Sequence, residues 1–234
     1  MQVVILCGGK GKRMSNLTEN TPKPLIKIGD VPIIIHIMNH FSRYGFNDFL
    51  LCAGYKKELF YDYFEKNPNK KWNVKVLDTG EDSETASRVL TISSHLGERF
   101  FLTYGDGISN VNLNELLKYH EEKKVLTTIT GINPISQYGV IEVENGLAIK
   151  FNEKPKMDEI INGGYMVMEK KVIEYFRSNE SIEEGPLNRL VNQKELAVFK
   201  HEDFWKGIDT EKDVETLNDI WNQGEIPWIT NSRR

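Results

Sequence analysis

The first fourteen residues constrain the fold more than any other stretch of the sequence. Residues 3–6 are four consecutive apolar residues, and Cys7-Gly8-Gly9-Lys10-Gly11-Lys12-Arg13 follows them directly. A short apolar run rich in β-branched side chains predicts a buried strand, and glycine permits positive φ angles and close approach of the backbone. The three glycines can therefore turn successive N–H groups toward one point, with basic side chains at its rim. We expect a strand that leads into a loop suited to a polyphosphate.

Two common nucleotide-binding loops do not fit this segment. A Walker A loop requires Gly-Lys followed by Ser or Thr, with another glycine five residues earlier, whereas Arg13 and Leu6 stand at these positions. A dinucleotide-binding fingerprint fits Gly9 and Gly11, but its third glycine falls on Met14, which disfavours a nicotinamide-dependent oxidoreductase. A plain strand-to-loop turn without a ligand is the alternative that stays open.

Length and composition exclude several classes of protein. With 234 residues, 39% hydrophobic and 27% charged, the chain is expected to fold as one globular domain, residues 1–234. No apolar run is long enough to span a bilayer and the start of the chain lacks a signal-peptide pattern, so we expect a cytoplasmic protein without a membrane partner. The net charge of −4 gives no electrostatic reason to expect nucleic-acid binding. Cys7 and Cys52 each end an apolar run, which favours reduced, partly buried thiols over a disulfide or a metal site.

Apolar patterns alternate between strands and helices in the first half of the chain. We predict strands over residues 3–6, 49–52, 74–77 and 100–103, and helices over residues 32–45, 59–64, 84–95 and 112–124. Asp30 is expected to cap the first of these helices. The alternation predicts an α/β fold with a doubly wound, mixed but mostly parallel sheet. From residue 125 onward strands and loops dominate, which predicts a β-rich region inserted in the C-terminal half, and Thr210 with Asp213 predicts the start of a last helix.

Lys23 and Asp106 occupy positions that favour a chemical role. Pro22 and Pro24 restrict the backbone on either side of Lys23, so that its ammonium group is presented from a stiff segment. A solvated lysine in a turn explains this tripeptide equally well. Asp106 follows a predicted strand and lies between two glycines, where a divalent ion would satisfy its charge and an Asx turn is the alternative.

A series of short motifs occurs in a specific order along the chain. The pattern Gly-Gly-x-Gly-x-Arg spans residues 8–13, and Pro-Lys-Pro follows at residues 22–24. Further motifs are Thr-Tyr-Gly-Asp-Gly at residues 103–107, Glu-Lys-Pro at 153–155, Ile-Asn-Gly-Gly at 161–164, Phe-Trp at 204–205 with Asp-Thr at 209–210, and Pro-Trp at 227–228. In this order the motifs resemble the sugar nucleotidyltransferase family, and within it most closely the glucose-1-phosphate cytidylyltransferases. The resemblance runs nearly from end to end.

The resemblance implies a Rossmann-like nucleotidyltransferase fold and a role for each matching residue. Residues 1–124 would form the nucleotide-binding part, and residues 125–234 the acceptor-binding part with the C-terminal helix. Arg13 and Lys23 would be catalytic, and Asp106 and Asp209 would hold Mg²⁺. The implied nucleotide contacts are Leu6, Cys7, Gly8, Gly9, Gly11, Lys12, Thr79, Gly80, Thr85, Arg88, Tyr104 and Gly105. The implied acceptor contacts are Tyr138, Gly139, Glu153, Lys154, Asn162, Gly163 and Gly164.

The reaction implied by the resemblance is transfer of CMP from CTP to a small phosphorylated acceptor, first of all a hexose 1-phosphate such as glucose 1-phosphate. The products would be pyrophosphate and a CDP-linked compound that serves surface polysaccharide biosynthesis. The enzyme itself would be a homo-oligomer. Two alternatives stay open: the same chemistry on a non-sugar phosphate such as phosphoglutamine in capsule modification, and a catalytically silent module that senses the nucleotide.

The chain also departs from the family pattern. Ala86-Ser87 replaces an expected glycine pair, Lys12 stands where many relatives have threonine, and the stretch between Phe64 and Val74 is shorter than expected. The motifs therefore indicate the type of reaction more directly than they indicate which nucleotide base or which acceptor the protein uses.

Overall fold

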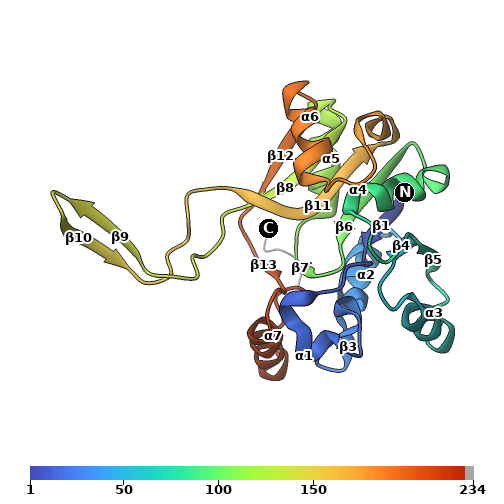
Figure 1. Cartoon of the computed structure of the whole chain (residues 1–234), viewed down its shortest axis with the longest axis horizontal. Helices are drawn as coiled ribbons and strands as arrows, with labels where there is room; N and C mark the ends of the chain where they lie inside the picture. The colour runs from blue at the N-terminus through green and yellow to red at the C-terminus, as the bar shows by residue number, and fades with distance from the viewer. Residues whose placement is uncertain (230–234) are drawn as a thin grey trace.

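A seven-stranded sheet runs through the centre of the molecule (Figure 1). The computed structural model describes residues 1–229, apart from the side chains of Lys12 and Ser15. The strand order is β12 (Leu196–His201), β8 (Thr127–Ile132), β11 (Ile161–Glu169), β6 (Arg99–Tyr104), β1 (Gln2–Leu6), β4 (Asp48–Ala53) and β5 (Asn73–Asp78). Strand β11 is antiparallel to both of its neighbours, β6 and β8, whereas the other adjacent pairs in this sheet are parallel.

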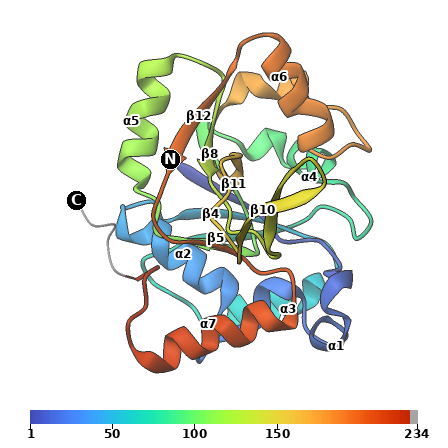
Figure 2. The same ribbon diagram turned by 90° about the vertical axis from the view of Figure 1, so that its left-hand side faces the viewer.

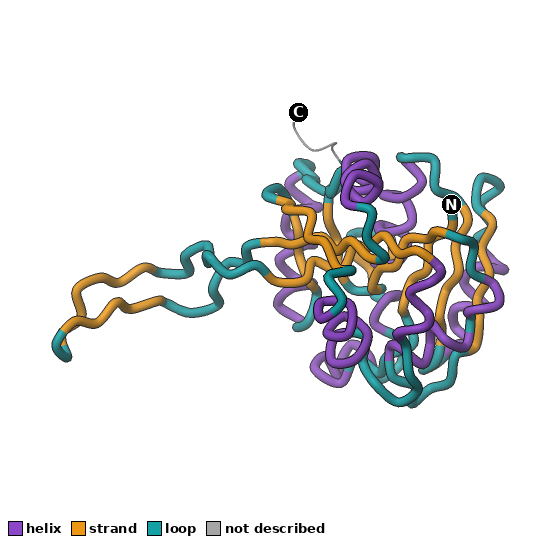
Figure 3. Tube along the Cα trace, turned by 90° about the horizontal axis from the view of Figure 1, so that it is seen from above, coloured by secondary structure: helices purple, strands orange, loops and turns teal. Residues whose placement is uncertain are grey.

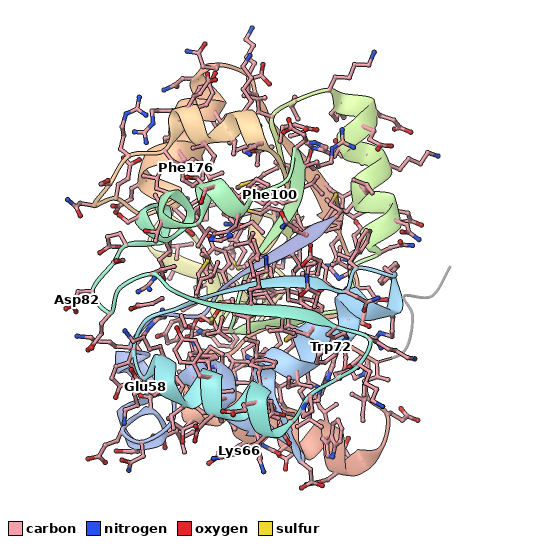
Figure 4. All side chains as sticks on the ribbon, turned by 90° about the vertical axis from the view of Figure 1, so that its right-hand side faces the viewer. Glu58, Lys66, Trp72, Asp82, Phe100 and Phe176 are labelled. Atoms are coloured by element: carbon pink, nitrogen blue, oxygen red, sulfur yellow. The ribbon has the colours of Figure 1, made fainter. Side chains whose placement is uncertain are left out.

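Helices cover both faces of the sheet, as a doubly wound fold requires (Figure 2). One face carries α2 (Ile33–Arg43), α3 (Lys57–Lys66) and α7 (Glu211–Gln223), and α5 (Leu113–Lys123) packs into the same core. The other face carries α4 (Thr85–Thr91) and α6 (Asn188–Asn192). Figure 4 shows Trp72 on the side of the first core and Phe100 and Phe176 on the side of the second.

Strand β1 is buried on both of its faces. The side chains of Val3 and Ile5 enter the first core, and those of Val4 and Leu6 enter the second. Burial on both faces explains why this strand appears in the sequence as a continuous apolar run rather than as an alternating pattern. The mostly parallel α/β fold predicted from the sequence is confirmed.

Three predictions of helix ends can be compared with the structure. The predicted helix over residues 84–95 is wrong in its length, because α4 ends at Thr91 and a separate 3₁₀ turn, Ser93–His95, follows. The predicted cap at Asp30 is also wrong, since residues 31–32 pair with residues 27–28 and α2 begins after Pro32. The cap at Thr210 is confirmed, and Asp213 completes a capping box with it.

The residues after 125 contribute three strands to the central sheet, β8, β11 and β12. Between β8 and β11 the chain leaves the sheet and forms an antiparallel hairpin of β9 (Val140–Glu144) and β10 (Leu147–Asn152). This hairpin projects far from the body of the molecule (Figures 1 and 3). We call residues 133–160 the arm, and it is the β-rich insertion expected in the C-terminal half. The division into two parts at residues 124 and 125 stays a prediction.

Within residues 1–229 no helix combines the length and the apolar character needed to cross a membrane. The thiols of Cys7 and Cys52 are free and buried, as predicted. Burial raises the pKa of the Cys52 thiol to about 12, so that it is protonated at neutral pH.

Candidate active site

The glycine-rich loop begins where β1 ends, at the carboxyl edge of the parallel strands. The Cys7 N–H donates to the Cys52 carbonyl oxygen at 3.1 Å, and the Tyr55 N–H donates to the Gly8 carbonyl oxygen at 3.0 Å. A Cβ atom on Gly8 would lie 2.0 Å from Nη1 of Arg88, so a neighbouring side chain requires glycine there. Gly11 has a φ of +61°, which L side chains rarely adopt. The loop therefore needs glycine for one steric and one conformational reason.

Arg88 joins the glycine-rich loop to the loop that follows β5. Its guanidinium donates to Oγ1 of Thr79 at 2.8 Å and to the carbonyl oxygens of Gly80, Gly8 and Glu81 at 2.7, 3.1 and 3.2 Å. The side chain is buried, and this burial lowers the pKa of Arg88. Because its hydrogen bonds go to oxygens of both loops, Arg88 fixes the position of one loop relative to the other. Thr79 and Gly80, both predicted as nucleotide contacts, are partners of Arg88 in this structure.

Lys23 stands at the centre of the site. It opens a 3₁₀ turn, Lys23–Leu25, directly after Pro22, and only 8% of its surface is exposed. Its ammonium nitrogen lies 2.8 Å from Oδ2 of Asp106 and 3.2 Å from Oδ1 of Asp209. A buried ammonium is stable only when its charge is paired, and the two carboxylates pair it. The alternative of a solvated lysine in a turn is therefore excluded.

A short two-stranded ladder brings Asp106 and Asp209 together across a long stretch of sequence. Strands β7 (Gly107–Ser109) and β13 (Trp205–Gly207) are antiparallel, with Gly107 opposite Gly207. The Ile208 N–H donates to the Asp106 carbonyl oxygen at 2.9 Å, which extends the ladder by one step. Both carboxylates therefore face the same lysine.

Asp106 and Asp209 fit a divalent ion. Their oxygens lie within 3.2 Å of the same nitrogen atom, and the two side chains keep 41% and 46% of their surface exposed. Paired, accessible carboxylates are suitable ligands for hard divalent ions. Among the described residues no group of three His, Cys, Asp or Glu side chains could hold a metal ion.

Arg13 and Lys10 stand at the mouth of the site on the glycine-rich loop. Nη2 of Arg13 lies 3.2 Å from Oδ1 of Asp209, and its side chain is 78% exposed. Nζ of Lys10 lies 3.1 Å from Glu81 and 2.7 Å from Asp82, and Asp82 stands at the outer rim of the molecule (Figure 4). Exposed ion pairs of this kind contribute little to stability. Both cations are therefore free to exchange a protein carboxylate for a phosphate.

A pocket of about 360 Å³ opens between the glycine-rich loop and the start of α4. This volume lies in the range typical of small-molecule sites. The predicted residues that line it are Leu6, Cys7, Gly8, Gly9, Gly11, Arg13, Lys23, Thr85, Arg88, Tyr104, Gly105, Asp106 and Asp209. The side chain of Lys12, another predicted contact, lies outside the described residues. We refer to this space as the nucleotide pocket.

A second, smaller pocket of about 110 Å³ adjoins the first and shares Tyr104, Asp106 and Asp209 with it. Asn162, Gly163 and Gly164, three of the predicted acceptor contacts, line this pocket. A Cβ atom on Gly164, whose φ is +79°, would lie 2.7 Å from Cδ2 of Tyr104, so glycine lets the tyrosine ring pack against the strand. We refer to this space as the acceptor pocket.

Tyr104 forms the wall that the two pockets share. Its hydroxyl donates to Oε1 of Glu183, and burial raises the pKa of Tyr104 well above its ordinary value. The tyrosine is therefore neutral at physiological pH and acts as a hydrogen-bond donor.

Comparison with known proteins identifies the family. The sequence matches the nucleotidyl transferase family over residues 2–224. The chain belongs to this family. This nucleotidyltransferase enzyme is 43% identical to a probable glucose-1-phosphate cytidylyltransferase from Bacillus subtilis (strain 168), over 97% of this chain and 99% of the relative. It is 34% identical to the glucose-1-phosphate cytidylyltransferase of Salmonella typhi, over 98% and 99% of the two chains.

Solved structures agree on the fold of this nucleotidyltransferase. A putative glucose-1-phosphate thymidylyltransferase from Bacillus anthracis superposes with a TM-score of 0.73 at 19% identity, covering 100% of this chain and 98% of the other. A UDP-glucose pyrophosphorylase superposes with a TM-score of 0.73 at 17% identity, covering 96% and 99%. The Rossmann-like sugar nucleotidyltransferase fold is thereby confirmed.

Four predicted acceptor contacts of the nucleotidyltransferase lie at the base of the arm and line neither pocket. Nζ of Lys154 lies 3.6 Å from Oε1 of Glu153, and both side chains are more than half exposed. Tyr138 is 77% exposed, and a Cβ atom on Gly139 would lie 3.2 Å from Oε2 of Glu153. The structure therefore gathers these four residues together on the arm, outside both pockets.

Sequence reasoning missed several residues that line the pockets. Met14, Pro24, Ser83 and Glu84 belong to the nucleotide pocket, and Trp205 belongs to the acceptor pocket. Nε1 of Trp205 donates to the Gly163 carbonyl oxygen at 2.7 Å and so fixes the backbone that forms one wall. The bulky pair Phe204-Trp205 just before Asp209 was a usable signal. No comparable signal marked Glu84.

Proposed function

We propose that this enzyme transfers CMP from CTP to glucose 1-phosphate, or to another small phosphorylated acceptor, and releases pyrophosphate. The observation that supports this most is the cluster of Lys23, Asp106 and Asp209 at the junction of two adjoining pockets. Two near-full-length relatives that carry the name glucose-1-phosphate cytidylyltransferase support the choice of CTP and a hexose 1-phosphate. A module that only senses the nucleotide would not need this cluster.

In the proposed reaction an oxygen of the acceptor phosphate attacks the α-phosphorus of CTP. The bond between the α-phosphorus and the oxygen that bridges to the β-phosphorus breaks, and pyrophosphate leaves with both electrons of that bond. The phosphate nucleophile is already an anion, so no proton has to be removed from it. Catalysis then consists of positioning and charge neutralisation, without a covalent enzyme intermediate.

Each part of the cluster has a distinct task in this scheme. Lys23 lies where the two pockets meet, so its ammonium would neutralise charge that develops around the α-phosphate. Arg13 and the N–H groups of the glycine-rich loop would hold the β- and γ-phosphates. Asp106 and Asp209 would hold a divalent ion, which we propose to be Mg²⁺, and the ion supplies further positive charge to the triphosphate.

We further propose that the base of the arm moves over the acceptor pocket when the acceptor binds. A groove of about 550 Å³ runs from Asp209 and Trp205 to Gln137 and Lys156, which stand on the arm. Glu153 and Lys154 follow one short step further out along the same hairpin, and their side chains bond only weakly to each other. In the closed position Lys154 would bind the acceptor phosphate and Glu153 an acceptor hydroxyl.

The arm also supports a homo-oligomer. Ile141, Val143, Leu147, Ile149 and Phe151 are 54–72% exposed. Ile141 pairs with Phe151 and Glu142 with Lys150, so Ile141, Val143 and Phe151 share one face, whereas the register shift between Ala148 and Lys150 places Leu147 opposite Glu144. An alternating hairpin of this kind is typical of a ribbon that is covered on one face. We propose that a second copy of the chain covers it. The free thiols favour action in the cytoplasm, where the CDP-linked product would enter surface polysaccharide biosynthesis.

The deciding experiment is pyrophosphate release from each of the four common nucleoside triphosphates, with glucose 1-phosphate, other hexose 1-phosphates and phosphoglutamine as acceptors. We expect the highest kcat/KM for CTP with glucose 1-phosphate, and no release without a divalent metal. Higher activity with a non-sugar phosphate would change the proposed acceptor but would leave the proposed reaction type unchanged. No release from any pair would refute the proposal.

The proposed oligomer has its own test. Light scattering on the wild type should give a mass larger than one chain, and Ile141→Ser with Phe151→Ser should lower it. Lys150→Ser, next to Phe151 but on the opposite face and paired with Glu142 at 2.9 Å, is the matched control and should leave the mass unchanged. A monomeric wild type would contradict the proposal.

A further inference from the structure

Glu84 differs from the other acids around the nucleotide pocket. Asp106 and Asp209 both pair with Lys23, and the nearby Glu81 and Asp82 pair with Lys10. Glu84 lines the pocket and is exposed, and within residues 1–229 its side chain makes no hydrogen bond or ion pair and does not cap α4. Its carboxylate is therefore accessible to a ligand in the pocket.

Glu84 also stands apart from the cationic end of the pocket. Lys23 and Arg13 both pair with Asp209, and neither pairs with Glu84. Glu84 directly precedes α4, whereas the glycine-rich loop leads through a short 3₁₀ turn into α1 (Ser15–Thr18), and α1 and α4 lie on opposite sides of the sheet (Figures 1 and 2). If the triphosphate meets Lys23 and Arg13, the base must point toward α4.

The charge of Glu84 supports the same orientation. A carboxylate beside a triphosphate would repel it, so an unpaired acid in this pocket is compatible only with the end that receives the base. Arg88, the cation closest in sequence to Glu84, interacts with it through charge, but the hydrogen bonds of Arg88 go to Thr79 and to three carbonyl oxygens. None of these hydrogen bonds occupies the carboxylate of Glu84.

We propose that Glu84 selects the base by accepting a hydrogen bond from the exocyclic amine of cytosine. Cytosine presents an amine at ring position 4, where uracil presents a carbonyl oxygen. A carboxylate only accepts, so it binds the amine and repels the carbonyl oxygen. This inference rests on the proposed function, because it takes CTP as the nucleotide, and it adds the residue that reads the base.

The test is Glu84→Gln, assayed for kcat/KM with CTP and with UTP at saturating acceptor. An amide can accept from cytosine and also donate to the uracil oxygen, so the CTP-to-UTP preference should fall about tenfold or more. Glu81→Gln is the matched control, since Glu81 belongs to the same loop but pairs with Lys10 and does not line the pocket. Its preference should equal that of the wild type.

A binding measurement separates the base from the phosphates. Tripolyphosphate should bind Glu84→Gln as tightly as it binds the wild type, whereas CTP should bind the variant more weakly. An unchanged CTP-to-UTP preference, equal weakening of tripolyphosphate and CTP, or a wild-type preference for GTP would overturn the assignment of Glu84. Wild-type inactivity with CTP and every acceptor would instead refute the proposed function, so the two failures are distinguishable.

Discussion

The nucleotide pocket and the arm are built in opposite ways. In the pocket the central groups are already fixed: Lys23 and Arg88 are 8% and 3% exposed and hydrogen-bond to protein oxygens. In the arm the apolar side chains face outward, with Leu147 72% and Tyr138 77% exposed. Under the proposed function, the half of the site that would bind the triphosphate is preorganised within one chain. The half that would bind the acceptor would be completed by movement of the arm or by a second copy of the chain.

The largest effect should come from the preorganised half. Lys23→Ala removes the charge at the junction of the two pockets, and we expect kcat to fall by about 10²–10³-fold, as for the loss of other transition-state charge contacts. The measurement is steady-state pyrophosphate release. Lys66→Ala is the control, because Lys66 pairs with Asp62 on α3, lines neither pocket and should change kcat little. An effect of Lys23→Ala confined to KM would show that Lys23 only binds ground-state nucleotide.

A smaller effect is expected from the arm. Lys154→Ala should lower kcat/KM for every phosphorylated acceptor by about 10–100-fold, the value of one hydrogen bond to a charged group, while the Kd for CTP stays nearly constant. Glu153→Gln should instead change the ranking of acceptors in a competition assay. Lys150→Ala, further out on the same hairpin, should leave both quantities unaltered. Should Lys154→Ala leave acceptor kinetics unchanged, the arm has no part in acceptor binding.

Stability should also respond differently at neighbouring positions of the glycine-rich loop. Gly8→Ala places a Cβ atom 2.0 Å from Nη1 of Arg88 and is expected to lower the free energy of unfolding by about 1–3 kcal/mol, as overpacking does. Gly9→Ala meets no atom within 4 Å and should be nearly neutral. Urea denaturation of both variants gives the comparison. Equal stability of the two would mean that the Arg88 contact is not rigid.

The last expected effect, which is small near neutral pH, is on the pH dependence of stability in the body of the molecule. Burial lowers the pKa of His40 to about 3, and its Nε2 contacts the Val111 carbonyl oxygen at 2.9 Å. Below its unfolded pKa of about 6.5 the unfolded chain binds a proton that the folded chain does not, so stability falls as the pH is lowered from 6.5 toward 3. The contribution of His40 approaches about 1.4 kcal/mol per pH unit.

Thermal unfolding between pH 7 and pH 5 measures this slope. His40→Gln keeps a donor for Val111 but does not titrate, so its slope should be shallower than that of the wild type. The arm, residues 133–160, has no histidine, and its variants should keep the wild-type slope. A slope unchanged by His40→Gln would assign the acid sensitivity to His36, His120 and His201, whose pKa values burial also lowers.

The same contrast explains what sequence reasoning could and could not predict. Local features were accessible: the apolar run of β1, the glycine loop, and the position of Asp106 at a strand end all follow from short-range chemistry. The ladder between Gly107 and Gly207 that joins Asp106 to Asp209 links residues 100 positions apart in the chain, and only the resemblance to a family suggested the pairing.

The contacts that each side chain makes were harder to predict from the sequence than the types of residue at the site. Arg88 was expected to contact the nucleotide, but the sequence does not reveal that four protein oxygens surround its guanidinium. Glu153 and Lys154 were expected at the acceptor, but the direction in which a hairpin leaves a sheet depends on a few backbone angles at its base. Glu84 was missed because an isolated acid before a helix has many ordinary explanations.

The reversed direction of β11 has a consequence for how this scaffold can diversify. Because β11 is antiparallel to β6, its first residues, Asn162 to Gly164, reach the edge where the other strands end. Residues of the acceptor pocket are thus attached to the N-terminal end of β11. Residues of the nucleotide pocket follow the C-terminal ends of the neighbouring strands. The whole of residues 133–160 can be exchanged or lengthened between two fixed attachment points without changing the register of any parallel pair. If the arm contacts the acceptor as proposed, replacing this one segment would change the acceptor and leave the residues of the nucleotide pocket in place.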